Sequence, residues 1–166
     1  MSSILWVEDQ VQPDLPDLFA RAVVAGHRVT VVPDATSALT ALQNSFDVVI
    51  VDIRIDPGDD PAWASYYYDQ CTGDKTVARL GIQLLRSIWV KNPDVPIDDC
   101  KRPQWIKPEM VGILTVEGLD LCQDDLDELG ISLEHHVLKA ASGDPTRRLL
   151  ELAEKIEEDL RTKGVA

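Results

Sequence analysis

The chain has 166 residues, of which 45% are hydrophobic and 27% charged; this is the composition of a globular protein and excludes disorder, collagen and coiled coil. Its 29 acidic and 16 basic residues leave a net charge of −13, which argues against nonspecific binding to nucleic acid or an anionic membrane because phosphate contacts need clustered cations. No apolar run approaches the roughly 18 residues that span a bilayer, and the N-terminal residues lack the pattern of a signal peptide.

Short β-rich runs alternate with helical patterns along the chain. The predicted strands cover 3–7, 27–32, 46–53, 110–116 and 134–140. The predicted helices cover about 14–25, 35–44, 76–91, 119–129 and 145–163. Aspartates are placed to cap three of these helices and glycines to end two of them, namely Asp14, Asp34, Asp144, Gly26 and Gly164.

Alternation of five strands with five helices predicts the α/β class: a doubly wound, five-stranded parallel sheet with helices on both faces and right-handed crossovers. At this length we expect a single domain over 1–166. We expect the flavodoxin-like strand order 2-1-3-4-5, in which the functional site lies beyond the carboxyl ends of the strands, where the strand order reverses.

Acidic side chains stand at the ends of two strands that are neighbours in this order. Glu8 and Asp9 follow the first strand, and Asp52 ends the third. Three carboxylates in one crevice repel one another, and Mg²⁺ is the cation that would best compensate them. Thr115 and Lys139, at the ends of the fourth and fifth strands, would add a hydroxyl and an ammonium group. Taken singly, each residue has an ordinary structural explanation, but together they predict phosphoryl transfer.

At these residues the sequence resembles the receiver (CheY-like) domain of bacterial two-component response regulators. The resemblance is carried by ILWVEDQ, FDVVIVDIRI, GIQLLRSI, GILTVEG and HHVLKA. It implies that Asp52 accepts a phosphoryl group from a phosphohistidine on a sensor histidine kinase or phosphotransfer protein, and that Thr115 and Lys139 contact the phosphoryl oxygens and transmit the signal. The implied Mg²⁺ ligands are Glu8, Asp9, Asp52 and the backbone carbonyl of Arg54.

The sequence departs from this family in four places. Two segments, 56–75 and 92–109, show no clear period and behave as insertions, since roughly 20 extra residues separate Asp52 from the glycine that opens the third helix. Ala140 replaces the proline that usually follows the lysine. His136 takes the position of an aromatic switch residue; it could rotate or titrate like a switch, or simply be a polar residue on an edge strand.

The two segments hold five of the nine aromatic residues, which predicts either a local core or an interface, and we favour the local core. These aromatic residues are Trp63, Tyr66, Tyr67, Tyr68 and Trp105. A zinc site from Cys71 and Cys100 with His135 or His136 is disfavoured because the spacing follows no known ligand pattern. The stretch 117–134 carries seven acidic residues and no Lys or Arg, so we expect either a negative face for a basic partner or a plain solvated helix.

The leading hypothesis is therefore a stand-alone receiver, a signalling switch rather than an enzyme, that acts through another, unknown protein. The alternative is a pseudo-receiver adaptor that keeps the fold but is never phosphorylated. A haloacid dehalogenase-like phosphatase is disfavoured because Arg54 stands where that chemistry needs a second aspartate. Three cysteines without a CxxC motif predict reduced thiols in a cytoplasmic protein, and the sequence leaves a homodimer open.

Overall fold

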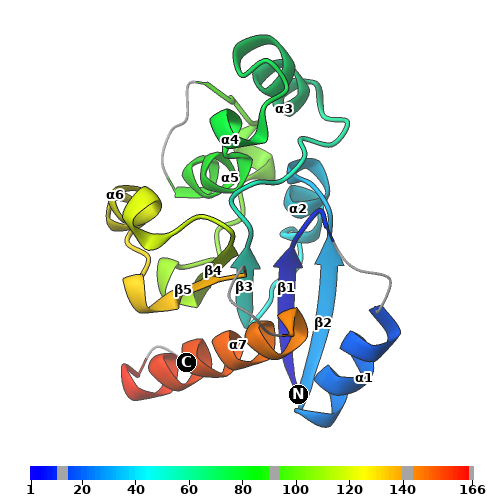
Figure 1. The fold of residues 1–166 in the computed structure, drawn as a ribbon, viewed down its shortest axis with the longest axis vertical. Coiled ribbons are helices and arrows are strands. Elements are labelled where there is room, and N and C mark those ends of the chain that lie inside the picture. The colour runs from blue at the N-terminus through cyan, green and yellow to red at the C-terminus, as the bar shows by residue number, and fades with distance from the viewer. Residues whose placement is uncertain (11–14, 90–93, 140–143, 165–166) are drawn as a thin grey trace.

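The computed structural model describes residues 1–10, 15–89, 94–139 and 144–164. Its centre is a five-stranded, all-parallel sheet in the order β2-β1-β3-β4-β5 (Figure 1). The strands are β1 (Ser2–Val7), β2 (His27–Val32), β3 (Val48–Val51), β4 (Val111–Thr115) and β5 (His136–Leu138). The predicted fold class and strand order are confirmed, although β3 and β5 are shorter than the sequence pattern indicated.

Helices pack on both faces of the sheet. The longer ones are α1 (Leu15–Val24), α2 (Ala35–Ala41), α5 (Leu80–Trp89), α6 (Leu119–Leu129) and α7 (Pro145–Thr162). The side chain of Asp34 accepts a hydrogen bond from the N–H of Ser37 at 2.7 Å, and that of Asp144 accepts one from Thr146 at 3.0 Å, so both predicted N-caps are confirmed. The third, Asp14, lies outside the described residues.

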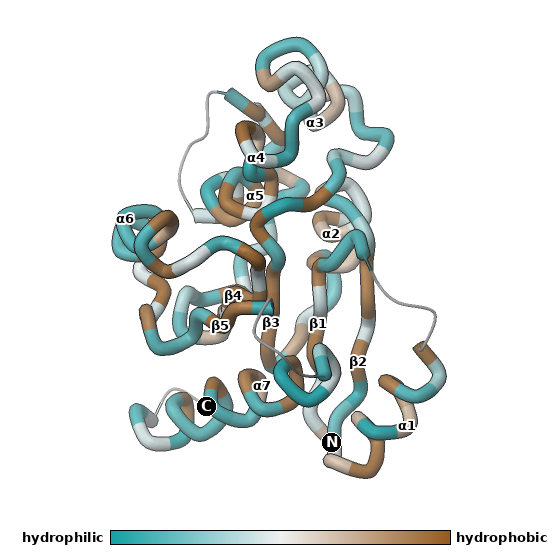
Figure 2. The backbone as a smooth tube through the Cα atoms, viewed as in Figure 1, coloured by the Kyte–Doolittle hydropathy of each residue, from teal (hydrophilic) through white to brown (hydrophobic). Residues whose placement is uncertain are grey.

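The sheet separates two apolar layers. One contains Ile4 and Trp6 of β1 packed against α1 and α7, while the other contains Leu5 and Val7 packed toward α2, α5 and α6. Every residue of β3 and β4 is buried, as expected for strands covered on both faces. In Figure 2 the tube is brown along much of β3, while the helices around the sheet alternate between hydrophilic and hydrophobic residues. Within the described residues, no helix is both long and apolar enough to cross a membrane.

The segment 56–75 is more regular than its sequence indicated. It contains the helix α3 (Pro61–Ser65) and the π-helical turn η1 (Tyr66–Gln70), and it ends where α4 (Lys75–Ala78) begins. The helix expected over 76–91 is wrong as one continuous element, because Arg79 adopts φ +46° and separates α4 from α5. Elements of four or five residues are too short to produce a recognisable period, which explains why they were missed.

The second segment contains the 3₁₀ turns η2 (Asp99–Lys101) and η3 (Pro108–Met110), and a further one, η4 (Leu133–His135), replaces the beginning of the expected fifth strand. Trp105 is half-buried and packs beside Phe46, with its indole N–H donating to the carbonyl of Leu42 at 2.9 Å.

The aromatic residues of the first segment belong to the main core. Trp63, Tyr66 and Tyr67 are buried in the layer that contains α2 and α5, whereas Tyr68 is exposed. Three of these four residues are therefore buried, but the predicted local core is wrong, because they extend the main core and do not form a separate one. This packing anchors the segment beyond the carboxyl ends of the strands, on the side where α3 lies in Figure 1.

Candidate functional site

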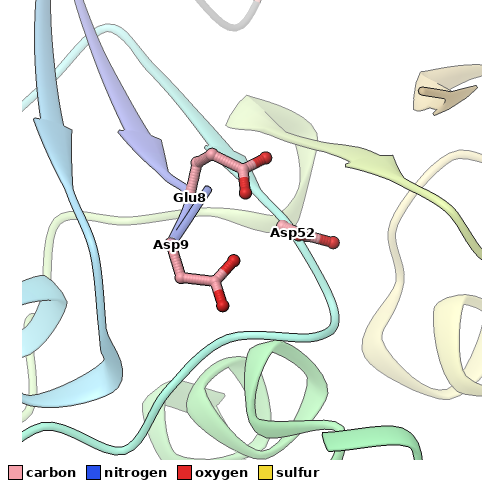
Figure 3. A group of neighbouring side chains, drawn as sticks. All are labelled: Glu8, Asp9 and Asp52. Atoms are coloured by element: carbon pink, nitrogen blue, oxygen red, sulfur yellow. The ribbon is translucent and has the colours of Figure 1, made fainter. Parts of the chain in front are cut away.

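The sheet register brings three acidic residues together. The N–H of Glu8 donates to Val32 at 2.9 Å and that of Asp52 donates to Val7 at 2.9 Å, so parallel pairing continues into both strand ends. Glu8, Asp9 and Asp52 each offer a carboxylate oxygen within 4.8 Å of the others, and Figure 3 shows the three side chains directed to the same side of the chain. This is the reversal point between β1 and β3 at which the sequence placed its site.

Burial makes this acidic group electrostatically costly. Glu8 and Asp52 are 2% and 3% exposed, and the Asp9 side chain is equally buried. Burial, together with the charge of Asp52, raises the pKa of Glu8 to about 7 despite its contact with Lys139. A cation placed among these carboxylates would therefore relieve both desolvation and mutual repulsion.

Lys139 supplies one such cation. Its Nζ contacts Glu8 and lies 2.8 Å from Asp52. Burial opposes the charged ammonium, but its hydrogen bonds and charge interactions with Asp52 and Glu8 outweigh this, so the pKa of Lys139 is raised. Its backbone N–H donates to Thr115 at 2.8 Å, which ties the end of β5 to β4. The neighbouring Ala140, where the expected proline is missing, lies outside the described residues.

Lys75 supplies a second cation that the sequence analysis missed. Its Nζ contacts Asp9 and lies 3.1 Å from Asp56, so it joins the two ends of the 56–75 segment at the acidic group. These hydrogen bonds outweigh the effect of burial and raise the pKa of Lys75. The available signal was that Lys75 is the only basic residue in a segment that carries five aspartates.

The acidic group fits a divalent cation. The Oδ1 atom of Asp9 is buried without a hydrogen-bond partner, which leaves one oxygen of this carboxylate free to act as a ligand. Three carboxylates of this kind suit a hard cation that keeps several waters. Among the described residues, no cysteine or histidine belongs to a comparable cluster, and Cys71 is buried while Cys100 is exposed. Arg54, the implied carbonyl ligand, is adjacent, and its N–H donates to Asp52 at 3.3 Å.

Thr115 lies fully buried at the end of β4, and its hydroxyl accepts a hydrogen bond from the N–H of Glu117 at 3.4 Å. The buried carboxylate of Glu117 binds the guanidinium groups of Arg54 at 3.1 Å and Arg79 at 3.0 Å. The Nε2 of half-buried His136, on the edge strand, lies 2.8 Å from the carbonyl oxygen of Glu117. Glu117, which the sequence analysis did not single out, therefore connects the chain beside Asp52 to β5.

The acidic stretch 117–134 is less exposed as a charged surface than its sequence suggested. Four of its seven carboxylates pair with basic residues from elsewhere in the chain. The pairs are Glu117 with Arg54 and Arg79, Asp125 with Arg79 and Arg86, Glu128 with Arg86, and Glu134 with Lys155. Much of the predicted negative face is thus neutralised inside the molecule.

A pocket of about 200 Å³ adjoins the acidic group between α1 and α7. Trp6, Glu8 and Lys139 all line it, so Trp6 faces the same side of β1 as Glu8, as the two-residue spacing predicted.

Comparisons with known proteins agree on the fold. No family model and no curated protein matches the sequence. Among solved structures, the receiver domain of the Francisella response regulator 1452 has 17% identity and a TM-score of 0.57, with 96% of this chain and 98% of that chain covered. A CheY-like receiver domain protein from Methanospirillum hungatei JF-1 has 16% identity and a TM-score of 0.57, with 98% of each chain covered.

A third structure, the BeF3-activated N-terminal receiver domain of Klebsiella pneumoniae RstA, has 23% identity and a TM-score of 0.52, with 93% of this chain and 97% of that chain covered. All three identities are low, so the likeness concerns the fold and leaves the chemistry to be argued from the site. Nearly the whole chain therefore has the fold of a response-regulator receiver domain.

Proposed function

We propose that this protein is a phosphoacceptor switch in which Asp52 receives a phosphoryl group from a phosphohistidine on a sensor histidine kinase or phosphotransfer protein. In this reaction a carboxylate oxygen of Asp52 bonds to phosphorus, the bond from phosphorus to the donor nitrogen breaks, and the imidazole leaves with that electron pair. The chain would act as one domain, with 56–75 and 92–109 as insertions.

The observation that carries the proposal is the environment of the Asp52 carboxylate. Lys139 lies 2.8 Å away and would hold an equatorial phosphoryl oxygen, while Glu8 and Asp9 lie close enough to share a cation with Asp52. Mg²⁺, held by Glu8, Asp9 and Asp52, would neutralise charge on the incoming phosphoryl group. Burial of Asp52 orients it and excludes most of the water that could hydrolyse the product.

Output would pass through the β4 end of the site. A phosphoryl group on Asp52 adds charge and acceptor oxygens that draw Lys139 and the Thr115 hydroxyl toward it. Because the Thr115 hydroxyl accepts the N–H of Glu117, that movement would disturb the contacts of Glu117 with Arg54 and His136. A downstream protein would read the resulting change on α6 and β5.

The decisive experiment is incubation with Mg²⁺ and acetyl phosphate followed by intact-mass measurement. We expect one phosphoryl adduct on the wild-type protein, none on Asp52→Asn, and an unchanged adduct on Asp124→Asn, which alters an exposed aspartate on α6. An adduct that survives Asp52→Asn, or its absence from the wild type under conditions where Mg²⁺ binds, would contradict the proposal.

A second candidate is a pseudo-receiver adaptor that is never phosphorylated. It is favoured by one observation: Lys75 and Lys139 together already place two ammonium groups on the acidic residues. Titration with beryllium fluoride, a phosphoryl mimic, separates the two candidates. A Trp6 fluorescence change with Mg²⁺ and beryllium fluoride supports the switch, whereas Mg²⁺ binding without any response to beryllium fluoride supports the adaptor.

A further inference from the structure

We propose that Lys75 is a built-in counter-cation that competes with the divalent metal at Asp9, so that the 56–75 segment sets the metal affinity of the site. This inference rests on the proposed function only in taking the acidic group as a metal site. It concerns the regulation of that site. It also assigns a role to the 56–75 segment, which lies outside the motifs that carry the resemblance to receiver domains.

The first argument is position. Lys75 reaches Asp9 from the far end of a segment that begins at Asp56, whereas Lys139 reaches Glu8 and Asp52 from β5. The two lysines thus divide the three carboxylates between them. The Lys75 side chain is 31% exposed and therefore has room to change its conformation, while the Asp9 side chain that it neutralises is buried.

The second argument is charge. When all three carboxylates are ionised, they retain one net negative charge with both lysines in place and two with Lys139 alone, and a divalent cation would neutralise the latter. An ammonium bonded to Asp9 stands next to any ion that shares Asp9 with Glu8 and Asp52, and two positive charges at such a distance repel each other in a buried site. Metal binding therefore requires Lys75 to withdraw.

The third argument is that Lys75 has an alternative partner. Asp56 lies 3.1 Å from its Nζ and is half exposed, so the ammonium can keep this partner after it leaves Asp9. Asp56 is held in place by its backbone, whose carbonyl accepts the N–H of Ala35 at 3.0 Å at the start of α2. The pair Asp9 and Asp56 thus offers Lys75 one position inside the acidic group and one at its edge.

The backbone of the 56–75 segment is anchored on both sides of its aromatic residues. Asp74 caps α4 by accepting from the N–H of Thr76 at 2.9 Å, which fixes the backbone from which Lys75 extends. Trp63 and Tyr67, earlier in the segment, are buried in the core. Lys75 is therefore delivered to Asp9 from a fixed base, and only its side chain needs to move.

The test is a calorimetric titration of the metal-free protein with MgCl2 alone. We expect Lys75→Met to bind Mg²⁺ at least about tenfold more tightly than the wild type, because one positive charge has left the site. Lys155→Met is the matched control, since it removes a half-exposed lysine on α7 that pairs with Glu134, and its Mg²⁺ affinity should equal that of the wild type. Unchanged or weaker binding by Lys75→Met would overturn the proposal.

A second variant keeps the proposal testable if Lys75→Met folds poorly. Asp56→Asn leaves Lys75 in place but removes its alternative partner, so Mg²⁺ affinity should fall several-fold; a rise would overturn the proposal. Trp6 fluorescence gives an independent readout of the same titrations, because Trp6 and Glu8 line one pocket.

The two proposals fail separately. If Lys75→Met tightens Mg²⁺ binding but Asp52 accepts no phosphoryl group, the competition stands and the phosphoacceptor function falls. If Asp52 is phosphorylated normally and Lys75→Met leaves the Mg²⁺ affinity unchanged, the function stands and the competition falls. If neither the wild type nor Lys75→Met binds Mg²⁺ by calorimetry or fluorescence, the competition is overturned as well.

Discussion

Two long connections interrupt the alternation of strands and helices, and they serve the molecule differently. The first, 56–79, leads from β3 to α5 and brings Lys75 to Asp9 and Arg79 to Glu117. The described part of the second, 94–110, leads to β4, and two of its longer side chains donate to main-chain carbonyls. Trp105 donates to Leu42 at 2.9 Å, and Arg102 donates to Ser87 at 3.0 Å.

The comparison shows that composition does not decide what a connection does. Both segments are polar stretches interrupted by prolines and tryptophans. The first starts beyond the carboxyl end of β3, beside the acidic group, so its charged side chains reach carboxylates. The second reaches the amino end of the sheet, where Trp105, Lys107 and Met110 line a pocket with Ser2 of β1. The position of each segment in the topology therefore decides its role: the first contributes side chains to the acidic group, and the second supports the opposite end of the sheet.

The largest effect should come from replacing Trp63 of the first connection, with Trp105 of the second connection as the comparison. Trp63 is fully buried, and Trp63→Ala should lower the free energy of unfolding by about 3–5 kcal/mol through the cavity that it leaves. Trp105→Ala should cost about half as much, because this side chain is only half-buried. Urea unfolding measures both values. Equal losses would show that the first connection is no better anchored than the second.

The pH dependence of stability tests the site end of the comparison. The pKa of Glu8 is about 7 in the folded protein and about 4.5 as its ordinary value, so the unfolded chain releases this proton at lower pH. The contribution of Glu8 to stability is therefore fully present below pH 4.5 and is lost as pH rises to about 7, by on the order of 3 kcal/mol.

Unfolding of the metal-free protein across this pH range measures that dependence. Glu8→Gln should remove it, while Glu158→Gln, which changes an exposed glutamate of α7, should keep it. A Glu8→Gln curve that runs parallel to the wild type would show that other groups carry the dependence.

A moderate effect is expected at the link between the first connection and β4. Glu117→Gln leaves Arg54 and Arg79 without their shared buried carboxylate and should cost about 2 kcal/mol, less than a fully buried pair because both guanidinium groups are partly exposed. Glu109→Gln, in the second connection, alters an exposed side chain and should stay within about 0.5 kcal/mol of the wild type. Thermal or urea unfolding distinguishes these values, and similar losses would remove the distinction between the connections.

The smallest perturbation is a chemical label. Cys71, in the first connection, and Cys122, on α6, are buried, while Cys100, in the second connection, is exposed. A thiol reagent should therefore modify Cys100 rapidly in the native protein and the other two only after unfolding. Peptide mapping identifies the modified residue. Rapid native labelling of Cys71 would show that the first connection opens readily.

The main features of the fold were predictable because they depend on local patterns. Buried β-branched runs identify β3, and capping aspartates mark the starts of α2 and α7. The acidic group was also predictable, since parallel strands end at one edge of the sheet. The structure adds the reason for Gly81 in the first turn of α5: a Cβ there would lie 2.1 Å from the Asp52 carbonyl oxygen, so the position requires glycine.

The contacts of the site were harder to predict. Lys75 lies 66 residues from Asp9, and its arrival there depends on the combined path of α3, η1 and α4. The left-handed conformation of Arg79 breaks a sequence that otherwise has helical periodicity. Glu117 was counted as one charge in an acidic stretch, because no local signal shows that two arginines from other elements surround it.

The sequence by itself determined the five strands, most of the longer helices and the order in which they alternate, and it placed Glu8, Asp9, Asp52, Thr115 and Lys139 at strand ends. These follow from interactions between residues close together in the chain and from the handedness of parallel crossovers. Only the tertiary structure decided which charges neutralise one another: Lys75 with Asp9, Lys139 with Glu8 and Asp52, and Arg79 with Glu117. Pairing of charges depends on distances in space, and a single sequence does not encode these locally.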